Sequence, residues 1–171
     1  MQPHKNVKRL VEAYILLRDS GEVEEKLLIV GKTSYGSNVF DTINKSKYSK
    51  DIYSLGFVPL EDLPAFYSGA KALVFVSLHE GCGIPLIEAM ACGTAVITSN
   101  VSAMPEIVNG AALLVDPYNP EDIMKSMKKI ITDESLRKSL IDKGYLRARD
   151  FTWQRYVREN LEVYKKVLNY N

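Results

Sequence analysis

Short runs of apolar, β-branched residues alternate with segments of helical periodicity along most of the chain. Apolar residues recur at helical spacing from Val7 to Arg18, which predicts a helix with Asn6 as its N-cap. The apolar runs predict strands, since uninterrupted runs of this length are typical of strands covered on both faces. These runs are Lys26–Gly31, Ile52–Phe57, Ala72–Ser77, Ala95–Thr98 and Ala112–Val115.

The segments between these runs predict the helices and turns that connect parallel strands. We expect a loop with a weak helix over Lys32–Lys50 and helices over Leu60–Ala70 and Ile84–Cys92. A turn is expected over Met104–Gly110, followed by a helix opened by Pro120. The remainder is expected to be helical, with breaks near Gly144 and Phe151. This order predicts an α/β domain with a doubly wound, Rossmann-like, mostly parallel sheet and helices on both faces. We expect one such domain over residues 1–171.

Composition and charge narrow the class of protein. Of the 171 residues, 46% are hydrophobic and 25% are charged, as in an ordinary globular domain. The formal net charge of +1 supplies no field that attracts nucleic acid, so no nucleic-acid partner is expected. No apolar run approaches the roughly 18 residues of a spanning helix, and the polar N-terminus does not resemble a signal peptide, so we expect a cytoplasmic protein. Cys82 and Cys92 are not spaced as a metal pair.

The segment after the third predicted strand is the strongest candidate for chemistry. In doubly wound sheets ligands bind at the carboxyl ends of the strands, and there the sequence reads SLHEGCGIPLIEAMACG. Gly81 and Gly83 allow close backbone approach, and the helix that follows offers free amides that attract phosphate. Glu80 and Glu88 could accept hydrogen bonds from ribose or sugar hydroxyls. Taken singly, Glu80 also fits a cap, and Glu88 fits a solvated helix face.

This segment resembles the E-x7-E signature, EGFG-x-P-x-x-EAMA-x-G, of retaining glycosyltransferases with the GT-B fold, in particular glycosyltransferase family 4 (glycosyl transferases group 1). Further segments resemble the family in the same order: PHKNVKRLVEAY, KLLIVG, IYSLGFVPLEDLPAFYSGAKALVFVSLHEG, GTAVITSNVSAMPEIV, GAALLVDPYNPEDI and FTWQRYVRENLEVYKKVL. The resemblance covers nearly the whole chain. It implies a C-terminal, nucleotide-sugar-binding domain over residues 1–171, closed by a helix at about 152–169.

Two family features that precede the first of these segments are missing here. One is a first strand, central in a 3-2-1-4-5-6 sheet, that ends in a phosphate-contacting arginine. The other is an N-terminal Rossmann domain that supplies the acceptor site. The resemblance therefore implies that the first strand of the sheet is absent from this chain and that the N-terminal GT-B domain is a partner it needs.

The resemblance also assigns roles to residues. Lys5 corresponds to the lysine that contacts the donor diphosphate, Glu88 to the glutamate that holds the ribose hydroxyls, and Glu80 to the catalytic glutamate that contacts the transferred sugar. The other donor-binding positions are Gly81, Cys82, Gly83 and Ile84, facing the sugar and phosphate, and Gly56, Phe57 and Val58, beside the nucleobase. Cys82 replaces the usual Phe and Ala95 the usual Pro, but the backbone rather than those side chains would bind.

The implied function is transfer of a hexose, such as mannose or glucose, from a nucleotide diphosphate sugar to a glycan, lipid or small acceptor. No D-x-D motif is present, and we expect neither a metal nor another cofactor. The isolated chain is expected to be inactive without the N-terminal domain. Two alternatives stay open: a non-catalytic nucleotide-binding or interaction module, and the domain of a GT-B sugar-nucleotide epimerase.

Three other patterns carry less weight. The GKT at Gly31–Thr33 lacks the first glycine of a P-loop, and the His79-Glu80 pair lacks the second histidine of a zinc protease. Lys125, Lys128 and Lys129 fit a solvated helix face first, and second a peripheral contact with anionic lipid at the inner face of the membrane.

Overall fold

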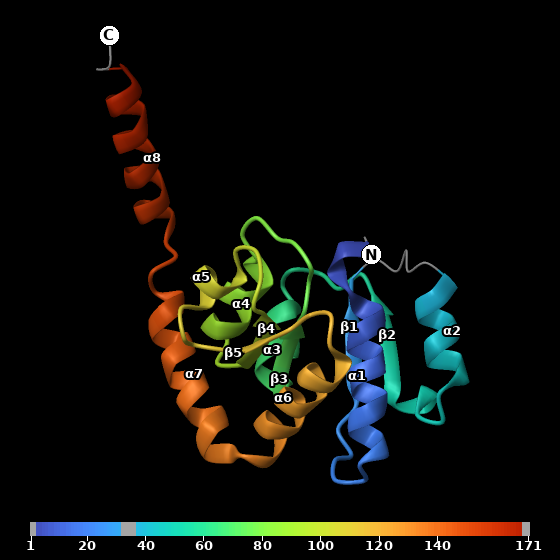
Figure 1. Cartoon of the computed structure of the whole chain (residues 1–171). Helices are drawn as coiled ribbons and strands as arrows, with labels where there is room; N and C mark the ends of the chain where they lie inside the picture. The colour runs from blue at the N-terminus through green and yellow to red at the C-terminus, as the bar shows by residue number, and fades with distance from the viewer. Residues whose placement is uncertain (1–2, 32–36, 169–171) are drawn as a thin grey trace.

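The computed structural model describes residues 3–31 and 37–168, in which strands and helices alternate (Figure 1). The first half contains η1 (Pro3–Lys5), α1 (Val7–Asp19), β1 (Leu27–Val30), α2 (Ser37–Lys45), η2 (Ser49–Asp51), β2 (Ile52–Gly56), α3 (Leu63–Gly69) and β3 (Ala72–Phe75). The second half contains α4 (Ile84–Ala91), β4 (Ala95–Ser99), α5 (Met104–Val108), β5 (Leu113–Val115), α6 (Pro120–Thr132), α7 (Glu134–Ala148) and α8 (Trp153–Leu168).

The strands form two parallel sheets. β1 pairs with β2, with Leu27 opposite Ile52, while β3 pairs with β4 and β4 with β5. The predicted doubly wound, parallel α/β class is confirmed. Among the described residues, however, no strand joins β1 to β3, so the sheet is interrupted between them. The interruption lies where the resemblance puts the family's first strand.

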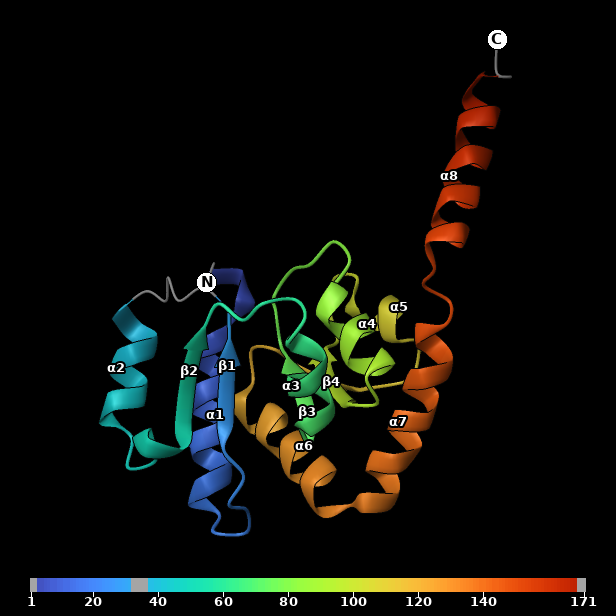
Figure 2. The ribbon, with the colours of Figure 1, turned by 180° about the vertical axis from the view of Figure 1, so that it is seen from behind.

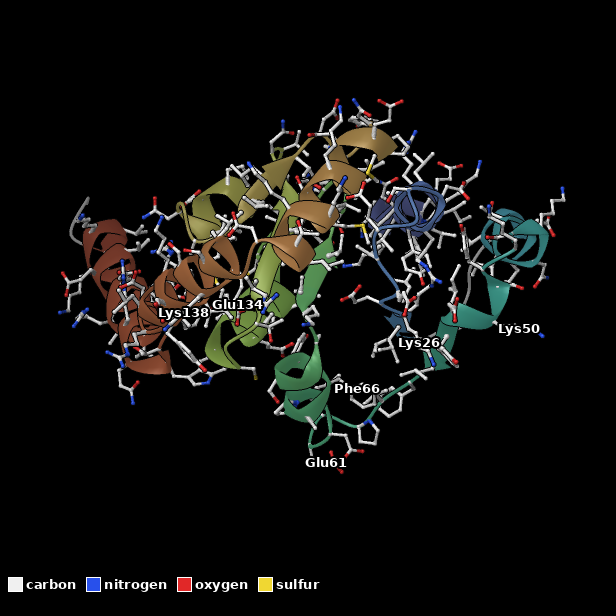
Figure 3. All side chains as sticks on the ribbon, turned by 90° about the horizontal axis from the view of Figure 1, so that it is seen from below. Lys26, Lys50, Glu61, Phe66, Glu134 and Lys138 are labelled. Carbon is white, nitrogen blue, oxygen red and sulfur yellow. The ribbon has the colours of Figure 1, made fainter. Side chains whose placement is uncertain are left out.

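A shared hydrophobic core holds the two sheets together. One cluster of buried side chains takes Leu27 and Ile29 from β1 and Ile97 and Val115 from the second sheet. Helices α1 and α6 pack against each other and contribute to this cluster. Figure 3 shows α1 and α6 on one side of the strands and α3, with the labelled Phe66, on the other. The helical layer is therefore continuous where the sheet is not.

The interruption leaves two strand edges unpaired. All residues of β4 are buried, because this strand is paired on both sides. All residues of β3 are only partly buried, although its sequence, ALVF, is as apolar as that of a central strand. On β1, Leu28 is 51% exposed. Because β1 pairs only with β2 and β3 only with β4, the facing edges of β1 and β3 are open among the described residues.

Some predicted boundaries are corrected by the structure. The break expected near Phe151 is confirmed at 149–152. The other break lies at Asp133 and not near Gly144, which is buried inside α7. The expected turn over Met104–Gly110 contains the short helix α5. The weak helix expected within Lys32–Lys50 is α2, and Lys32 itself lies outside the described residues.

The last helix, α8, projects away from the remainder of the chain (Figure 1). None of its described residues is buried, and Trp153 is 80% exposed. Its apolar residues gather on one face, a pattern typical of a helix that packs against another surface. Within the described part of the chain, no helix combines the length and the apolar character that crossing a bilayer requires.

Candidate functional site

The predicted site residues gather at the carboxyl edge of the strands. Moving away from the interruption, β1 is followed by β2 on one side, and β3 is followed by β4 and β5 on the other. The order of the strands therefore reverses between β1 and β3. Ligands of doubly wound sheets bind outside the strands at such a reversal. In Figure 2, η1, the segment after β2 and the segment before α4 all lie at this edge.

Lys5 is held at this edge by its neighbour Asn6. The Asn6 side chain is buried and donates hydrogen bonds to the carbonyl oxygens of Val76, at 3.0 Å, and Pro117, at 2.7 Å. Its backbone is left-handed, with φ of 57°, which asparagine tolerates better than most residues. Asn6 occupies the N-cap position of α1, but it makes no capping hydrogen bond. The predicted cap is therefore a tertiary clamp that joins the start of α1 to the residue after β3 and to the segment after β5.

Lys5 and Glu80 form an ion pair across the site. Lys5 Nζ donates to Glu80 Oε1 at 2.7 Å, and the side chains are 31% and 13% exposed. The ammonium also lies 5.2 Å from the centroid of the Phe75 ring. The partial burial weakens screening by salt, so the pair fixes both groups more firmly than a surface pair would. The two residues that the resemblance assigns to diphosphate and sugar are thus in direct contact.

Ser102 fixes the backbone around Glu80, a role that sequence reasoning missed. Ser102 Oγ donates to the Glu80 carbonyl oxygen at 2.9 Å and accepts from the Glu80 amide at 3.2 Å. The same hydroxyl lies 3.2 Å from His79 Nδ1. Ser102 has a positive φ of 57°, a strained conformation for serine. No local sequence signal links position 102 to position 80, because the contact forms only when β4 lies beside β3.

The glycine segment opens α4 as the sequence predicts. Gly83 is the N-cap, with φ of 60°, and a Cβ there would lie 3.0 Å from Leu86 Cδ1. A Cβ on Gly81 would meet no heavy atom within 4 Å. No side chain caps this helix end, and Cys82 and Ile84 are exposed. The positive end of the helix dipole therefore faces the carboxyl edge uncapped, as an anion-binding helix end requires.

Glu88 lies further along α4 and meets α3. Tyr67 donates its hydroxyl to Glu88 Oε2 at 2.8 Å. Burial, and then the hydrogen bond to Glu88, raise the pKa of Tyr67 well above its usual range. Burial also raises the pKa of the Cys92 thiol, with a smaller contribution from the Glu88 charge. One oxygen of Glu88 therefore accepts a hydrogen bond from a phenol whose protonated form is favoured further by its surroundings.

The three residues expected beside the nucleobase follow β2. Gly56 has φ of 70°, and its carbonyl oxygen accepts from the Gly31 amide at 2.7 Å. Phe57 is 71% exposed. Within the described residues no hydrogen bond joins Gly56–Val58 to the Lys5–Glu80 pair or to Glu88, so the segment shares only the edge of the fold with them.

The comparison with protein families decides what kind of protein this is. The sequence model of the family described as Glycosyl transferases group 1 matches residues 1–147. The chain belongs to this family. It is 33% identical over 166 residues to the O-antigen chain mannosyltransferase B of Escherichia coli, covering 96% of this chain and 44% of that protein. The chain thus spans less than half the length of curated relatives that it matches.

Solved structures of other proteins share the fold of this glycosyltransferase domain. HepE of Anabaena, solved in complex with UDP and glucose, superposes with a TM-score of 0.81 at 18% identity, covering 99% of this chain and 46% of that one. The C-terminal domain of LpcC, a glycosyl transferase group 1 family protein of Francisella tularensis, gives a TM-score of 0.75 at 23% identity. It covers 87% of this chain and 80% of that one. These likenesses establish the fold of a GT-B C-terminal domain.

Among the described residues no three His, Cys, Asp or Glu side chains gather as a metal site would require. Of the basic group on α6, Lys128 is paired with Glu22 at 2.6 Å, while Lys125 and Lys129 are exposed. This pairing reduces the positive charge that the helix presents.

Proposed function

We propose that this domain binds the nucleotide-sugar donor of a retaining, family 4-like hexosyltransferase. The observation that carries the proposal is the Lys5–Glu80 ion pair beside the uncapped start of α4, at the reversal point of the sheet. A cation and an open helix end suit the diphosphate of such a donor. A carboxylate that accepts hydrogen bonds from hydroxyl groups suits its sugar. The mannosyltransferase relatives favour mannose as the hexose.

In this proposal the donor diphosphate replaces Glu80 as the partner of Lys5. Negative charge grows on the diphosphate as the glycosidic bond breaks, and a fixed cation and helix dipole stabilise that charge without reorganising. Glu80, released from Lys5, accepts hydrogen bonds from the sugar and orients it. The amides of Gly81 to Ile84 hold the sugar and the phosphate, and no metal is needed.

The remaining roles belong to the nucleoside and to the acceptor. Glu88 holds the ribose hydroxyls, and the backbone of Gly56 to Val58 lies beside the base. An acceptor hydroxyl attacks from the face that the diphosphate leaves, so the anomeric configuration is retained. This part of the proposal rests on the family resemblance.

We further propose that the active enzyme needs an N-terminal domain and a strand between β1 and β3. Such a strand would satisfy the open edges of both sheets and lead into η1 at the carboxyl edge. The N-terminal domain would bind a glycan or lipid acceptor, and the apolar face of α8 would have a surface to pack against. We propose a cytoplasmic enzyme that acts at the inner face of the membrane, where lipid-linked acceptors are reached.

Calorimetric titration with UDP, GDP and ADP tests the donor site directly. We expect one of the three to bind in the presence of EDTA, because the proposed site uses no metal. Lys5→Ala and Glu88→Ala should each weaken that binding about tenfold or more, equivalent to ~1.4 kcal/mol. Lys5→Ala should remove the ionic contact with the diphosphate, and Glu88→Ala the hydrogen bonds with the ribose.

Lys8 and Glu12 provide the matched control. They form a similar ion pair on α1, at 3.4 Å, and neither belongs to the proposed site. Lys8→Ala and Glu12→Ala should leave the affinity unchanged. The donor site would be contradicted if the Lys8 and Glu12 variants lost as much affinity as the Lys5 and Glu88 variants. It would also be contradicted if no nucleotide bound to the folded chain. If the nucleotide bound without EDTA but not with it, the donor site would stand and only the proposal that it uses no metal would be wrong.

A further inference from the structure

Tyr67 makes a contact that the donor chemistry described above does not use. It lies on α3, and its hydroxyl donates to Glu88 Oε2 on α4 at 2.8 Å. Tyrosine and glutamate are separated by 21 positions in the sequence, so the contact depends on how α3 packs against α4. No hydrogen-bond partner within the described residues occupies the other carboxylate oxygen of Glu88.

The Tyr67 side chain is itself held in place. Its ring packs against the buried cluster that contains Leu86 and Met90 of α4. Its carbonyl oxygen accepts from Thr94 Oγ1 at 2.6 Å, and Thr94 is buried. A phenol fixed by its ring and its backbone directs its hydroxyl without further loss of conformational entropy. Tyr67 is therefore a rigid donor, whereas Glu88 has three side-chain torsions to restrain.

We propose that Tyr67 is a positioning residue, which orients the Glu88 carboxylate so that its free oxygen accepts hydrogen bonds from the ribose hydroxyls of the donor. The inference rests on the proposed function, because it assigns the ribose to Glu88. Tyr67 itself does not touch the nucleotide in this arrangement. It occupies Oε2 and selects the rotamer of Glu88 that leaves Oε1 available.

The physical basis is the cost of ordering a partly buried carboxylate at the moment of binding. Glu88 is only partly buried, so without Tyr67 its carboxylate samples other rotamers and hydrates both oxygens. Binding would then have to restrain it. With Tyr67 present the restraint exists before the nucleotide arrives, which increases affinity by preorganisation. A tyrosine hydroxyl is protonated at neutral pH, and the rise in the pKa of Tyr67 caused by burial extends this donor form to more alkaline pH.

The test combines Tyr67→Phe with nucleotides that lack the ribose hydroxyls. Calorimetry would compare UDP, GDP and ADP with their 2′,3′-dideoxy counterparts on the wild-type chain and on the variant. Phenylalanine retains the ring packing and removes only the hydroxyl. We expect about tenfold weaker binding of the ribonucleotide, ~1.4 kcal/mol, and an unchanged affinity for the dideoxynucleotide.

Tyr53→Phe is the control, because Tyr53 lies on β2, is 40% exposed and has its hydroxyl 3.5 Å from Lys26 Nζ. It should change neither affinity. Equal weakening of the ribo- and dideoxynucleotide by Tyr67→Phe would indicate a merely structural role and overturn the inference, as would no change in either.

Different results would contradict the ribose assignment of Glu88 and the positioning role of Tyr67. If the wild-type chain binds ribo- and dideoxynucleotides equally well, the assignment of the ribose to Glu88 fails, and the role of Tyr67 fails with it. If the wild-type chain discriminates and Glu88→Ala abolishes the discrimination while Tyr67→Phe does not, only the inference about Tyr67 is wrong.

Discussion

Asn6 illustrates what a single residue does here that its sequence neighbourhood conceals. Its position before an amphipathic helix predicts a cap, yet its amide binds carbonyl oxygens of Val76 and Pro117, 70 and 111 positions away. Its Oδ1 accepts from Arg9 at 2.9 Å. Both the amide nitrogen and the oxygen of the side chain are therefore hydrogen-bonded, and the residue places Lys5 beside Glu80. Asparagine can do this because it combines a donor, an acceptor and tolerance of left-handed backbone.

Asn6→Asp should destabilise the chain by ~3 kcal/mol, because it removes two buried donated hydrogen bonds and directs a carboxylate at two carbonyl oxygens. Urea denaturation would measure the loss. Asn109→Asp is the control, since Asn109 also has a positive φ, of 41°, but is exposed. The control should change stability by less than about 0.5 kcal/mol. A similar loss in both variants would mean that added charge, not the clamp, is responsible.

Helix α7 shows why glycine is a poor guide to the end of an element. Gly144 lies in its interior, and a Cβ there would be 3.2 Å from Met90 Cγ and 3.6 Å from Met90 Cα. The glycine permits α7 to approach α4 closely, at some cost in helix propensity. A second close approach occurs at Gly93, just beyond α4, where Tyr145 of α7 covers the backbone. These contacts support the helix whose start forms the site.

Gly144→Leu should reduce the free energy of unfolding by ~2 kcal/mol, because the added side chain overpacks the α4–α7 contact by more than the helix propensity that it gains. Lys143→Leu, at an exposed position of the same helix, should have an effect below about 0.5 kcal/mol. Thermal and urea unfolding would measure the stability of the two variants against that of the wild-type chain. A Gly144→Leu variant as stable as the wild type would show that the helices can separate without cost.

At the scale of the whole molecule, the interrupted sheet is the dominant feature. Helices α1 and α6 bridge β1 and β3 through a common core, so the two sheets keep their places without a hydrogen-bonded strand between them. The edges that face the interruption remain open, as do the outer edges of β2 and β5 among the described residues. The site lies at the carboxyl end of the same region.

Amide hydrogen exchange should report these open edges. Amides of β4 should be the most protected, because neighbours pair with it on both sides. Alternate amides of β1 and β3, which face the interruption, should exchange about a hundredfold faster than those of β4, since they lack a backbone acceptor. Uniform protection across β3 would mean that another segment fills the space. Measurement by NMR distinguishes alternate amides within one strand.

The sequence predicted the strands and most helices, because these depend on local pattern. Strands appear at all five apolar runs, since short apolar runs rich in β-branched residues and bounded by turn residues favour strands. Gly83 opens and Gly93 follows α4 as predicted, because positive φ at a helix end favours glycine. The order of motifs was sufficient to indicate the glycosyltransferase family, which the family match confirms.

Contacts between distant segments were decided only by the tertiary structure. The clamp of Asn6, the hydroxyl of Ser102 on Glu80 and that of Tyr67 on Glu88 each join residues more than 20 positions apart. Packing of α3, β3 and β4 brings their partners within hydrogen-bond reach, and no spacing in the sequence encodes that distance. The continuous core likewise explains how the sheet tolerates its interruption, because burial by the helices does not depend on a strand between β1 and β3.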